Sequence, residues 1–310
     1  MNIFVLESDA DSYRPHLDHL DANITYSISV DTDQQHYDIV LAQPDLAAEY
    51  LRSGSTAQWI QSTWAGVRPL VDVMLKQPKL LNDTLVTGVK GVFGGQIAEY
   101  VFTYLLEEIR KPAALRQQQQ QHQWQPDWPS TLANRKMVIL GTGSIGRHLA
   151  MVARAFGLNI TGVSRSGQAA EHFHQVVPVT QLARAVEQTD YLVAVLPDTP
   201  AASNVIDQHI FTAMRNSPLL LNVGRASSID HPALLQALEK RQLRGAVLDV
   251  FAAEPLPQDD PLWDWPNVTV TPHIAAVSYP ADVAAVFLHN LEQFASKRPL
   301  SHLIDPNRGY

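Results

Sequence analysis

Three polar residues in the second half of the chain follow short apolar runs, and their types could act together on one substrate. They are Arg225, Glu254 and His273, and the apolar runs before them cover residues 219–223, 246–250 and 268–271. Apolar runs that alternate with helical segments form parallel sheets, in which the carboxyl ends of successive strands lie along one edge. Taken singly, each of the three could be an ordinary surface or loop side chain. Together they predict a reactive site at the carboxyl edge of a parallel sheet.

An arginine, a carboxylate and a histidine suit the reduction of a ketone that carries a neighbouring carboxylate. Hydride addition to the carbonyl leaves an alkoxide, and histidine is the natural side chain to give it a proton near neutral pH. A carboxylate such as Glu254 stabilises the protonated imidazole of His273 and orients its ring. Arg225 can bind the substrate carboxylate with two parallel N–H donors and polarise the carbonyl beside it. The implied substrate is a 2-keto acid.

A nucleotide-binding pattern lies upstream of these residues and could supply the hydride donor. A short apolar strand is expected at residues 137–140, and Gly-Thr-Gly-Ser-Ile-Gly follows it with no spacer, before a helical pattern. Gly141 permits a sharp turn, Gly143 lets the backbone approach a pyrophosphate, and Gly146 lets the helix pack closely on the sheet. The helix that starts at Ser144 would face the phosphates with unpaired N–H groups and the positive end of its dipole. The pattern predicts a dinucleotide cofactor.

The end of the second strand of this domain indicates which dinucleotide is bound. Residues 160–163 form this strand, and Ser164, Arg165 and Ser166 follow it. An NAD site presents Asp or Glu here to the ribose hydroxyls, whereas an NADP site has a small polar residue and an arginine that accommodates the 2′-phosphate. Arg165 could pair with that phosphate through charge-assisted hydrogen bonds, or it could be a solvated surface side chain. We predict that NADP(H) is preferred and that NAD(H) is possible.

Length and composition set the class of protein. The 310 residues are 45% hydrophobic and 17% charged, which allows two domains with separate cores. The net charge of −8 argues against nucleic acid as the main partner, and the absence of cysteine excludes disulfides, thiolate zinc sites and cysteine nucleophiles. The first residues carry no basic leader, and no apolar stretch is long enough to span a membrane. We therefore expect a cytoplasmic protein without a membrane or metal partner.

The first 98 residues alternate apolar strands with helical segments, which predicts a small parallel sheet with helices on both faces. The expected strands cover residues 3–6, 24–29, 39–42, 59–63 and 85–89. Trp64, Ala65 and Gly66 follow the fourth strand, at the edge where open α/β sheets bind ligands. The same three residues could equally form a plain turn between a strand and a helix.

A long helical stretch follows this sheet. Residues 99–123 have a helical pattern that Pro112 interrupts, and the glutamine-rich run at 117–121 predicts a solvated helix face. Residues 124–130 are expected to form a loop that leads to the second domain.

Several motifs run through the second half of the chain. They are Gly-Thr-Gly-Ser-Ile-Gly at 141–146, Leu-Pro-Asp-Thr-Pro at 196–200, Asn-Val-Gly-Arg at 222–225, Leu-Asp-Val-Phe at 248–251 with Glu-Pro-Leu-Pro at 254–257, and Val-Thr-Pro-His at 270–273. Together they resemble the D-isomer-specific 2-hydroxyacid dehydrogenase family, and the resemblance covers nearly the whole chain. Within the family, the chain most resembles the glyoxylate/hydroxypyruvate reductase branch. The features that carry this resemblance are the Ser-Arg-Ser stretch, the segment at 272–280 and the terminal residues Arg308, Gly309 and Tyr310.

The resemblance implies hydride transfer between NAD(P)H and a small 2-keto or 2-hydroxy acid. It implies that Arg225, Glu254 and His273 are the catalytic residues. The substrate would be bound by Arg225 and by Trp64, Ala65 and Gly66, whose backbone would hold its carboxylate. The residues implied to bind the cofactor are Gly141, Gly143, Ser144, Ile145, Gly146, Ser164, Arg165, Ser166, Pro197 and Asp249.

The resemblance also implies the architecture, an α/β protein of two doubly wound parallel-sheet domains. Residues 99–273 would form a Rossmann domain that binds NAD(P). Residues 1–98 and 274–310 would form a smaller, flavodoxin-like substrate domain built from both ends of the chain. Family members commonly form dimers through the helix that begins near Glu99, so a homodimer is expected.

Other interpretations remain beside this one. NAD(P)-sensing transcriptional corepressors are similar to the family and keep the same three residues, so a peptide-binding protein with incidental turnover is the alternative function. A formate-type dehydrogenase would be expected to carry Gln in place of Glu254. Arg68 stands where many members have Asp, and Tyr279 has no role assigned by a motif, so the side chain of the natural keto acid stays open.

Overall fold

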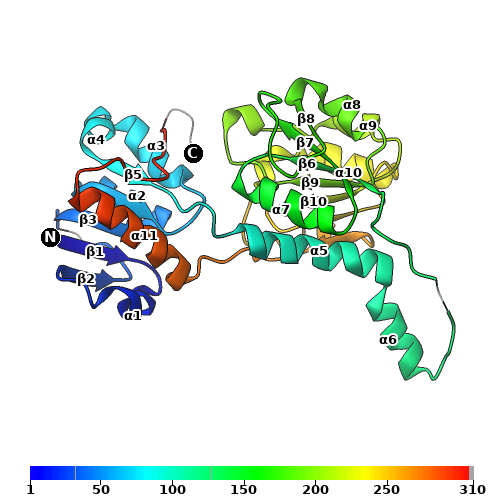
Figure 1. Cartoon of the computed structure of the whole chain (residues 1–310), viewed down its shortest axis with the longest axis horizontal. Coiled ribbons are helices and arrows are strands. Elements are labelled where there is room, and N and C mark those ends of the chain that lie inside the picture. Colours follow the sequence, from blue (N-terminus) through cyan, green and yellow to red (C-terminus); the bar gives the residue numbers. More distant parts are fainter. Residues whose placement is uncertain (32, 127, 307–310) are drawn as a thin grey trace. The chain divides into compact units, whose positions relative to one another are not determined.

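The chain divides into two compact units (Figure 1), in a computed structural model that describes residues 1–31, 33–126 and 128–306. The first unit is Met1–Val92 with Ser278–Tyr310, and the second is Phe93–Val277. The sequence-based boundaries, after residues 98 and 273, differ from these at both crossings. The helix expected near Glu99 already begins at Gly94, and backbone N–H groups up to Val277 are hydrogen-bonded within the second unit.

The first unit contains a five-stranded parallel sheet. Its strands are β1 (Asn2–Leu6), β2 (Asn23–Ser27), β3 (His36–Ala42), β4 (Thr56–Ser62) and β5 (Leu85–Thr87). Its helices are η1 (Ala10–Tyr13), α1 (Arg14–Leu17), α2 (Pro44–Arg52), α3 (Arg68–Lys76), α4 (Pro78–Asp83) and α11 (Pro280–Ala295). The strand order β2-β1-β3-β4-β5 is that of a flavodoxin-like sheet.

The last helix of the chain packs on this first sheet, which is why both chain ends belong to one unit. Trp59 of β4 is fully buried and stacks on Phe287 of α11, with ring centroids 5.3 Å apart. Asn290 of α11 is also buried, and its side-chain amide donates to Gln61 Oε1 at 3.2 Å. The buried aromatic contact therefore stabilises the packing of α11 on the sheet, and the buried pair of amide side chains fixes the register of the helix.

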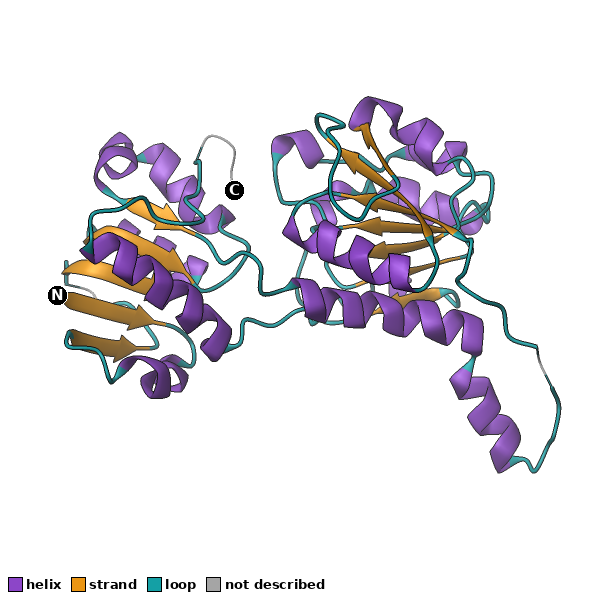
Figure 2. Ribbon diagram, in the orientation of Figure 1, coloured by secondary structure: helices purple, strands orange, loops and turns teal. Residues whose placement is uncertain are grey.

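The second unit contains a seven-stranded parallel sheet with helices packed on it (Figure 2). Its strands are β6 (Lys136–Leu140), β7 (Asn159–Ser164), β8 (Gln175–Pro178), β9 (Tyr191–Ala194), β10 (Leu219–Asn222), β11 (Gly245–Leu248) and β12 (Val268–Val270). Its helices are α5 (Gly94–Arg110), α6 (Pro112–Gln120), α7 (Ser144–Ala155), η2 (Val179–Gln181), α8 (Leu182–Val186), η3 (Pro200–Ala202), α9 (Gln208–Ala213), η4 (Ala226–Ser228), α10 (His231–Glu239) and η5 (Pro261–Asp264).

The order β12-β11-β10-β9-β6-β7-β8 is a Rossmann order with one added strand, because the sheet grows outward on both sides of the β6–β9 pair. The predicted fold class of two doubly wound parallel-sheet domains is confirmed. Among the residues that the structure describes, no helix combines the length and the apolar character that crossing a bilayer requires.

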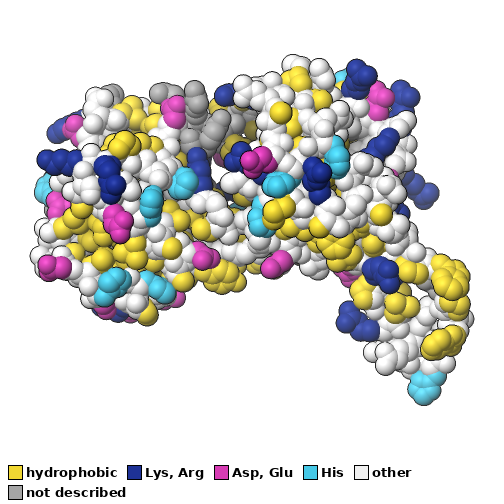
Figure 3. Space-filling model, in the orientation of Figure 1, with side chains coloured by type: hydrophobic (Ala, Val, Ile, Leu, Met, Phe, Trp, Pro, Cys, Tyr) yellow, Lys and Arg dark blue, Asp and Glu magenta, His cyan; other side chains and the backbone are white. Residues whose placement is uncertain are grey.

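The helix expected over residues 99–123 consists of two helices. Lys111 adopts a left-handed conformation with φ of 49° between α5 and α6, since Pro112 cannot continue the hydrogen bonding of α5. None of residues 112–120 is buried, and α6 projects from its unit. Figure 3 shows hydrophobic side chains gathered on this projecting segment, where Trp124 and Trp128 are 97% and 86% exposed. The glutamine-rich run lies on a solvated helix, as predicted.

Candidate active site

Arg225, Glu254 and His273 follow three neighbouring strands of the second unit. β10, β11 and β12 pair in parallel, so their carboxyl ends lie at one edge of the sheet. His273 Nδ1 lies 2.8 Å from Glu254 Oε2. Glu254 Oε1 accepts the backbone N–H of Phe251, also at 2.8 Å. The carboxylate is therefore held through both oxygens, and it fixes the orientation of the imidazole.

The hydrogen bond between His273 and Glu254 determines which nitrogen of the imidazole carries a hydrogen toward the carboxylate. An ionised carboxylate only accepts hydrogen bonds, so His273 Nδ1 carries the hydrogen that points at Glu254. Nε2 lies on the other side of the ring and is the atom that can exchange a proton with a bound molecule.

Arg225 is fixed through its backbone and sits near two carboxylates. The side chains of Asn222 and Ser228 both donate to its carbonyl oxygen, at 3.1 Å and 2.8 Å. Burial lowers the pKa of Arg225 below its ordinary value, and the carboxylates of Asp198 and Glu254 act in the opposite direction. A guanidinium stays charged in any case. The structure thus brings a partly desolvated cation close to Glu254.

His273 has an unusual backbone conformation that its neighbours maintain. Its φ of 55° lies in the left-handed region, which costs a residue other than glycine about 1–2 kcal/mol. Asp249 is 1% exposed and accepts hydrogen bonds from Thr271 Oγ1 at 2.6 Å, from the Ile274 N–H at 2.9 Å and from the Ala275 N–H at 2.8 Å. Hydrogen bonds to a carboxylate contribute about 1.5–3 kcal/mol each, so they outweigh the strain.

The sequence does not predict these hydrogen bonds between Asp249 and the segment of His273. It predicts instead that Asp249 contacts the cofactor. The cofactor contact stays a prediction. An acidic residue at the end of a buried apolar strand was the only available signal, and it does not reveal the partner.

The glycine turn at residues 141–146 fits the phosphates of a dinucleotide. Gly141 has a φ of 108°, which only glycine adopts readily, and a Cβ at Gly146 would lie 1.9 Å from the Gly141 carbonyl oxygen. A Cβ at Gly143 would meet open space among the described residues. The turn therefore presents bare backbone at the start of α7, where Ser144 and Ile145 carry N–H groups without a partner inside the helix.

The residues after β7 form a polar turn with an exposed arginine. Ser164 Oγ accepts the Gly167 N–H at 3.0 Å, and Arg165 and Ser166 are exposed beside it. Pro197 is exposed in the segment that follows β9. All of these residues follow strands of one parallel sheet, so they lie at its carboxyl edge with the glycine turn.

Trp64, Ala65 and Gly66 lie in the first unit, in the turn between β4 and α3. Glu7, directly after β1, is 7% exposed and accepts the Trp64 indole N–H at 3.2 Å and the Thr63 hydroxyl at 2.5 Å. A buried carboxylate therefore orients the turn. Glu7 could not be predicted from the sequence as part of this turn, because its partners Thr63 and Trp64 come from a distant segment of the chain.

The structure accounts for Arg68, whose role the sequence leaves open. Arg68 Nε pairs with Asp72 Oδ1 at 2.7 Å, one turn along the exposed face of α3. Tyr279 is the residue before α11 and is exposed.

The family follows from a match over the second unit. Residues 102–275 match the family model described as "D-isomer specific 2-hydroxyacid dehydrogenase, NAD binding domain". The match covers more than half of the chain and includes the glycine turn and all three polar residues at the carboxyl edge. The chain belongs to this family.

Relatives of this dehydrogenase extend the likeness to the first unit. Glyoxylate/hydroxypyruvate reductase A of Serratia proteamaculans (strain 568) is 32% identical over 246 residues, 77% of this chain and 79% of that protein. The crystal structure of a D-isomer specific 2-hydroxyacid dehydrogenase family protein from Aeromonas salmonicida subsp. salmonicida A449 is similar with a TM-score of 0.89 at 37% identity, covering 98% of this chain and 99% of that one. An NADPH-dependent glyoxylate/hydroxypyruvate reductase from Sinorhizobium meliloti, in complex with NADP and sulfate, has a TM-score of 0.85 at 25% identity, covering 100% and 99%.

The comparisons confirm the predicted family and the predicted resemblance to its glyoxylate/hydroxypyruvate reductase branch. The dehydrogenase is an enzyme that uses a nicotinamide cofactor on a 2-keto or 2-hydroxy acid. Of the segments that carried the resemblance to this branch, Arg308, Gly309 and Tyr310 lie outside the described residues.

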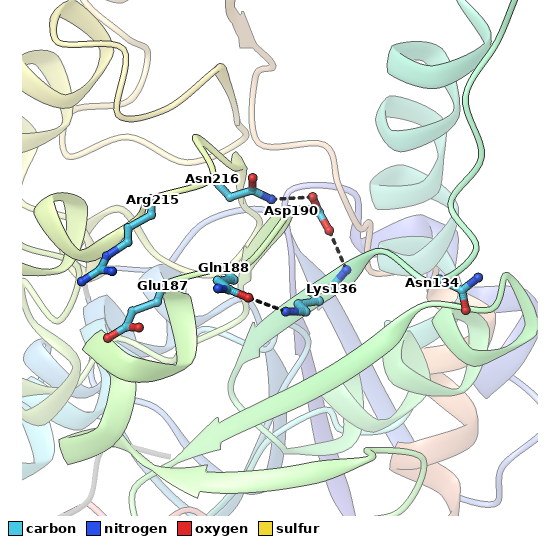
Figure 4. A pocket seen from close by; sticks show the side chains of 7 residues that line it. All are labelled: Asn134, Lys136, Glu187, Gln188, Asp190, Arg215 and Asn216. Carbon is cyan, nitrogen blue, oxygen red and sulfur yellow. Dashed lines mark hydrogen bonds between the residues drawn. The ribbon is translucent and has the colours of Figure 1, made fainter.

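A polar hollow of about 320 Å³ lies at the opposite, amino edge of the Rossmann sheet (Figure 4). It is lined by Asn134, Lys136, Glu187, Gln188, Asp190, Arg215 and Asn216. Lys136 Nζ donates to Gln188 Oε1 and Asn216 Nδ2 donates to Asp190 Oδ1, both at 2.8 Å. Because the hollow lies at the edge of the sheet away from the glycine turn, we assign no catalytic role to it.

Proposed function

We propose that this dehydrogenase reduces small 2-keto acids such as glyoxylate and hydroxypyruvate to D-2-hydroxy acids, and that it prefers NADPH to NADH. The observation that carries the proposal is the 2.8 Å pairing of His273 Nδ1 with Glu254 Oε2 near the cation of Arg225. The names of its relatives, which are glyoxylate/hydroxypyruvate reductases, support the substrate class.

In the proposed mechanism Arg225 binds the substrate carboxylate, and the backbone of Trp64, Ala65 and Gly66 contributes to that binding. The guanidinium presents two N–H donors in a plane, which matches the two oxygens of a carboxylate. Its charge also polarises the adjacent carbonyl, so that the carbonyl carbon becomes a better hydride acceptor.

His273 is the proton donor in this mechanism. When bound, the reduced nicotinamide supplies the hydride that adds to the carbonyl carbon. His273 Nε2 gives its proton to the carbonyl oxygen, which becomes the hydroxyl of the product. Glu254 holds Nδ1 throughout, so that Nε2 stays aimed and the imidazolium is stabilised before the transfer.

An assay of cofactor consumption tests the proposed function. Loss of NADPH and of NADH is followed with glyoxylate, hydroxypyruvate, pyruvate and bulkier 2-keto acids at matched concentrations. We expect the highest kcat/KM with NADPH as the cofactor and with glyoxylate or hydroxypyruvate as the substrate. Tight cofactor binding without turnover of any keto acid would instead favour a cofactor-sensing binding protein.

Replacing Arg165 with alanine is expected to weaken NADPH binding selectively. The proposed partner of Arg165 is the 2′-phosphate, and a charged hydrogen bond of this kind contributes about 1.5–3 kcal/mol, or about one to two decades in Kd. The Kd of each cofactor is measured by nucleotide fluorescence. Arg184→Ala, which removes an exposed arginine of α8, is the matched control. Equal losses for NADPH and NADH would contradict the assignment.

We also propose that the enzyme is a homodimer formed through α5 and the projecting segment after it. Trp124 and Trp128 support this proposal, because large exposed apolar side chains mark interaction surfaces. Light scattering is expected to give twice the chain mass for the wild type. The double variant Trp124→Ser, Trp128→Ser is expected to shift toward the monomer, whereas Trp263→Ser, at another exposed tryptophan, is not. A monomeric wild type would overturn the proposal.

A further inference from the structure

His273 sits in an irregular segment that needs partners from outside. The segment begins after β12, which ends at Val270, and runs to Val277, where the chain leaves the second unit. Asp249 holds the middle of the segment. The two ends of the segment are held by another element, the helix α5.

Two side chains of α5 contact the segment on either side of the histidine. The Tyr100 hydroxyl lies 2.5 Å from Thr271 Oγ1, two residues before His273. Gln96 bonds to the backbone of Val277, four residues after His273. Gln96 and Tyr100 are four residues apart, so they lie one turn from each other on the same face of the helix. Two side chains on one face of α5 therefore form hydrogen bonds with both ends of the segment.

The bond from Tyr100 has a defined direction. Thr271 gives its single hydroxyl hydrogen to Asp249 Oδ1 at 2.6 Å, so Tyr100 must donate to Thr271. Burial raises the pKa of Tyr100 above its ordinary value, which keeps the phenol protonated and able to donate. The result is a chain of hydrogen bonds from α5 through Thr271 to the carboxylate that holds the middle of the segment.

The contact of Gln96 uses both ends of its amide. Gln96 Oε1 accepts the Val277 N–H at 2.8 Å, and Gln96 Nε2 donates to the Val277 carbonyl at 3.0 Å. A carboxylate could accept but could not donate, and an apolar side chain could do neither. Gln96 lies near the start of the second unit and Val277 is the last residue of that unit, so the two hydrogen bonds join the beginning of the unit to its end.

We propose that Gln96 and Tyr100 are positioning residues that hold the segment of His273 so that its imidazole stays aimed for proton transfer. The inference rests on the proposed role of His273 as proton donor. A general acid must be placed within a fraction of an ångström of its target, and a displacement of about 1 Å can lower the rate about 100-fold. Loosening one end of the segment is a smaller disturbance than such a displacement. Loss of the Gln96 contact or of the Tyr100 contact is therefore expected to lower kcat about 10-fold.

Three variants test the proposal. Gln96→Ala removes both bonds to Val277, Tyr100→Phe removes only the bond to Thr271, and Gln96→Glu keeps the acceptor but loses the donor. We expect kcat for glyoxylate to fall about 10-fold in Gln96→Ala and Tyr100→Phe, while the Kd of NADPH stays within about twofold of wild type. Amide hydrogen exchange of Ala275 and Val277 is expected to become faster in both variants, because the segment opens more often.

Gln96→Glu adds a pH readout that a general loss of stability would not produce. A protonated carboxyl has one donor and one acceptor, as the amide has, so lowering the pH restores both bonds. The ratio of its kcat to that of wild type is therefore expected to rise as the pH falls. Taking the ratio at each pH removes the titration of groups that both proteins share.

Two further variants serve as controls. Thr103→Ala removes an exposed hydroxyl of the same helix, which donates to the Glu99 carbonyl at 2.7 Å. Tyr26→Phe removes a tyrosine hydroxyl in the first unit, which donates to Asp18 at 2.6 Å. Both are expected to keep the kcat and the exchange rates of wild type.

The outcomes separate this inference from the proposed function. If wild type reduces no keto acid, the proposed function fails, and the exchange rates still show whether α5 holds the segment. If wild type is active and Gln96→Ala and Tyr100→Phe keep its kcat and exchange rates, the positioning role is overturned. Parallel losses of kcat, cofactor binding and thermal stability in all five variants would also overturn it.

Discussion

Replacing His273 with alanine lowers kcat/KM for glyoxylate reduction by about two to four decades, the span typical of a lost general acid. The expectation follows from the 2.8 Å bond of Nδ1 to Glu254, which leaves Nε2 as the atom that can give a proton. Initial rates of NADPH loss at saturating cofactor measure the effect. His209→Ala, at an exposed histidine of α9, is the control and is expected to stay near wild type.

The pH profile identifies the proton donor more sharply than the rate alone. Reduction consumes the proton of the imidazolium, so kcat/KM of wild type falls as rising pH removes that proton. Glu254→Gln keeps a hydrogen-bonding side chain of similar shape but removes the negative charge that favours the protonated ring. The alkaline limb is therefore expected to move to lower pH, and in His273→Ala it disappears. A limb that stays in place in both variants would mean that another group gives the proton.

The sequence was sufficient for the features that depend on local pattern and on topology. The glycine turn could be predicted because Gly141 and Gly146 meet requirements set within a few residues, a positive φ and a close approach to the backbone. Arg225, Glu254 and His273 could be predicted as a group because consecutive parallel strands bring their carboxyl ends to one edge. No knowledge of side-chain packing was needed for either step.

The sequence was insufficient where a contact joins distant segments. Gln96 and Val277 are 181 residues apart, and no periodicity within α5 indicates that one amide will meet that backbone. The start of α5 also depends on a contact with a distant segment. α5 begins at Gly94, and a Cβ at that position would lie 2.7 Å from His148 Cβ, so the helix can approach α7 this closely only with glycine there. That constraint comes from α7, which lies some 50 residues further along the chain.

Replacing Arg225 with alanine lowers kcat/KM for glyoxylate by about two to four decades, because two charged hydrogen bonds of about 1.5–3 kcal/mol each are lost. Arg225→Lys keeps the charge but loses the planar fork, so a loss of about one to two decades is expected. Initial rates over a range of glyoxylate concentrations measure both variants. Free guanidinium ion is expected to restore part of the activity of Arg225→Ala and none of that of Arg225→Lys, whose side chain still fills the space.

A neutral substrate decides whether the effect concerns carboxylate recognition. Wild type is expected to discriminate strongly between pyruvate and its methyl ester, since the ester cannot accept two charge-assisted hydrogen bonds. In Arg225→Ala that discrimination should nearly vanish, because pyruvate loses the interaction that the ester never had. If Arg225→Ala lowered the rates with pyruvate and with the ester by the same factor, the guanidinium would act on the carbonyl or on Glu254, and the substrate carboxylate would have to be held by the backbone of Trp64, Ala65 and Gly66 alone.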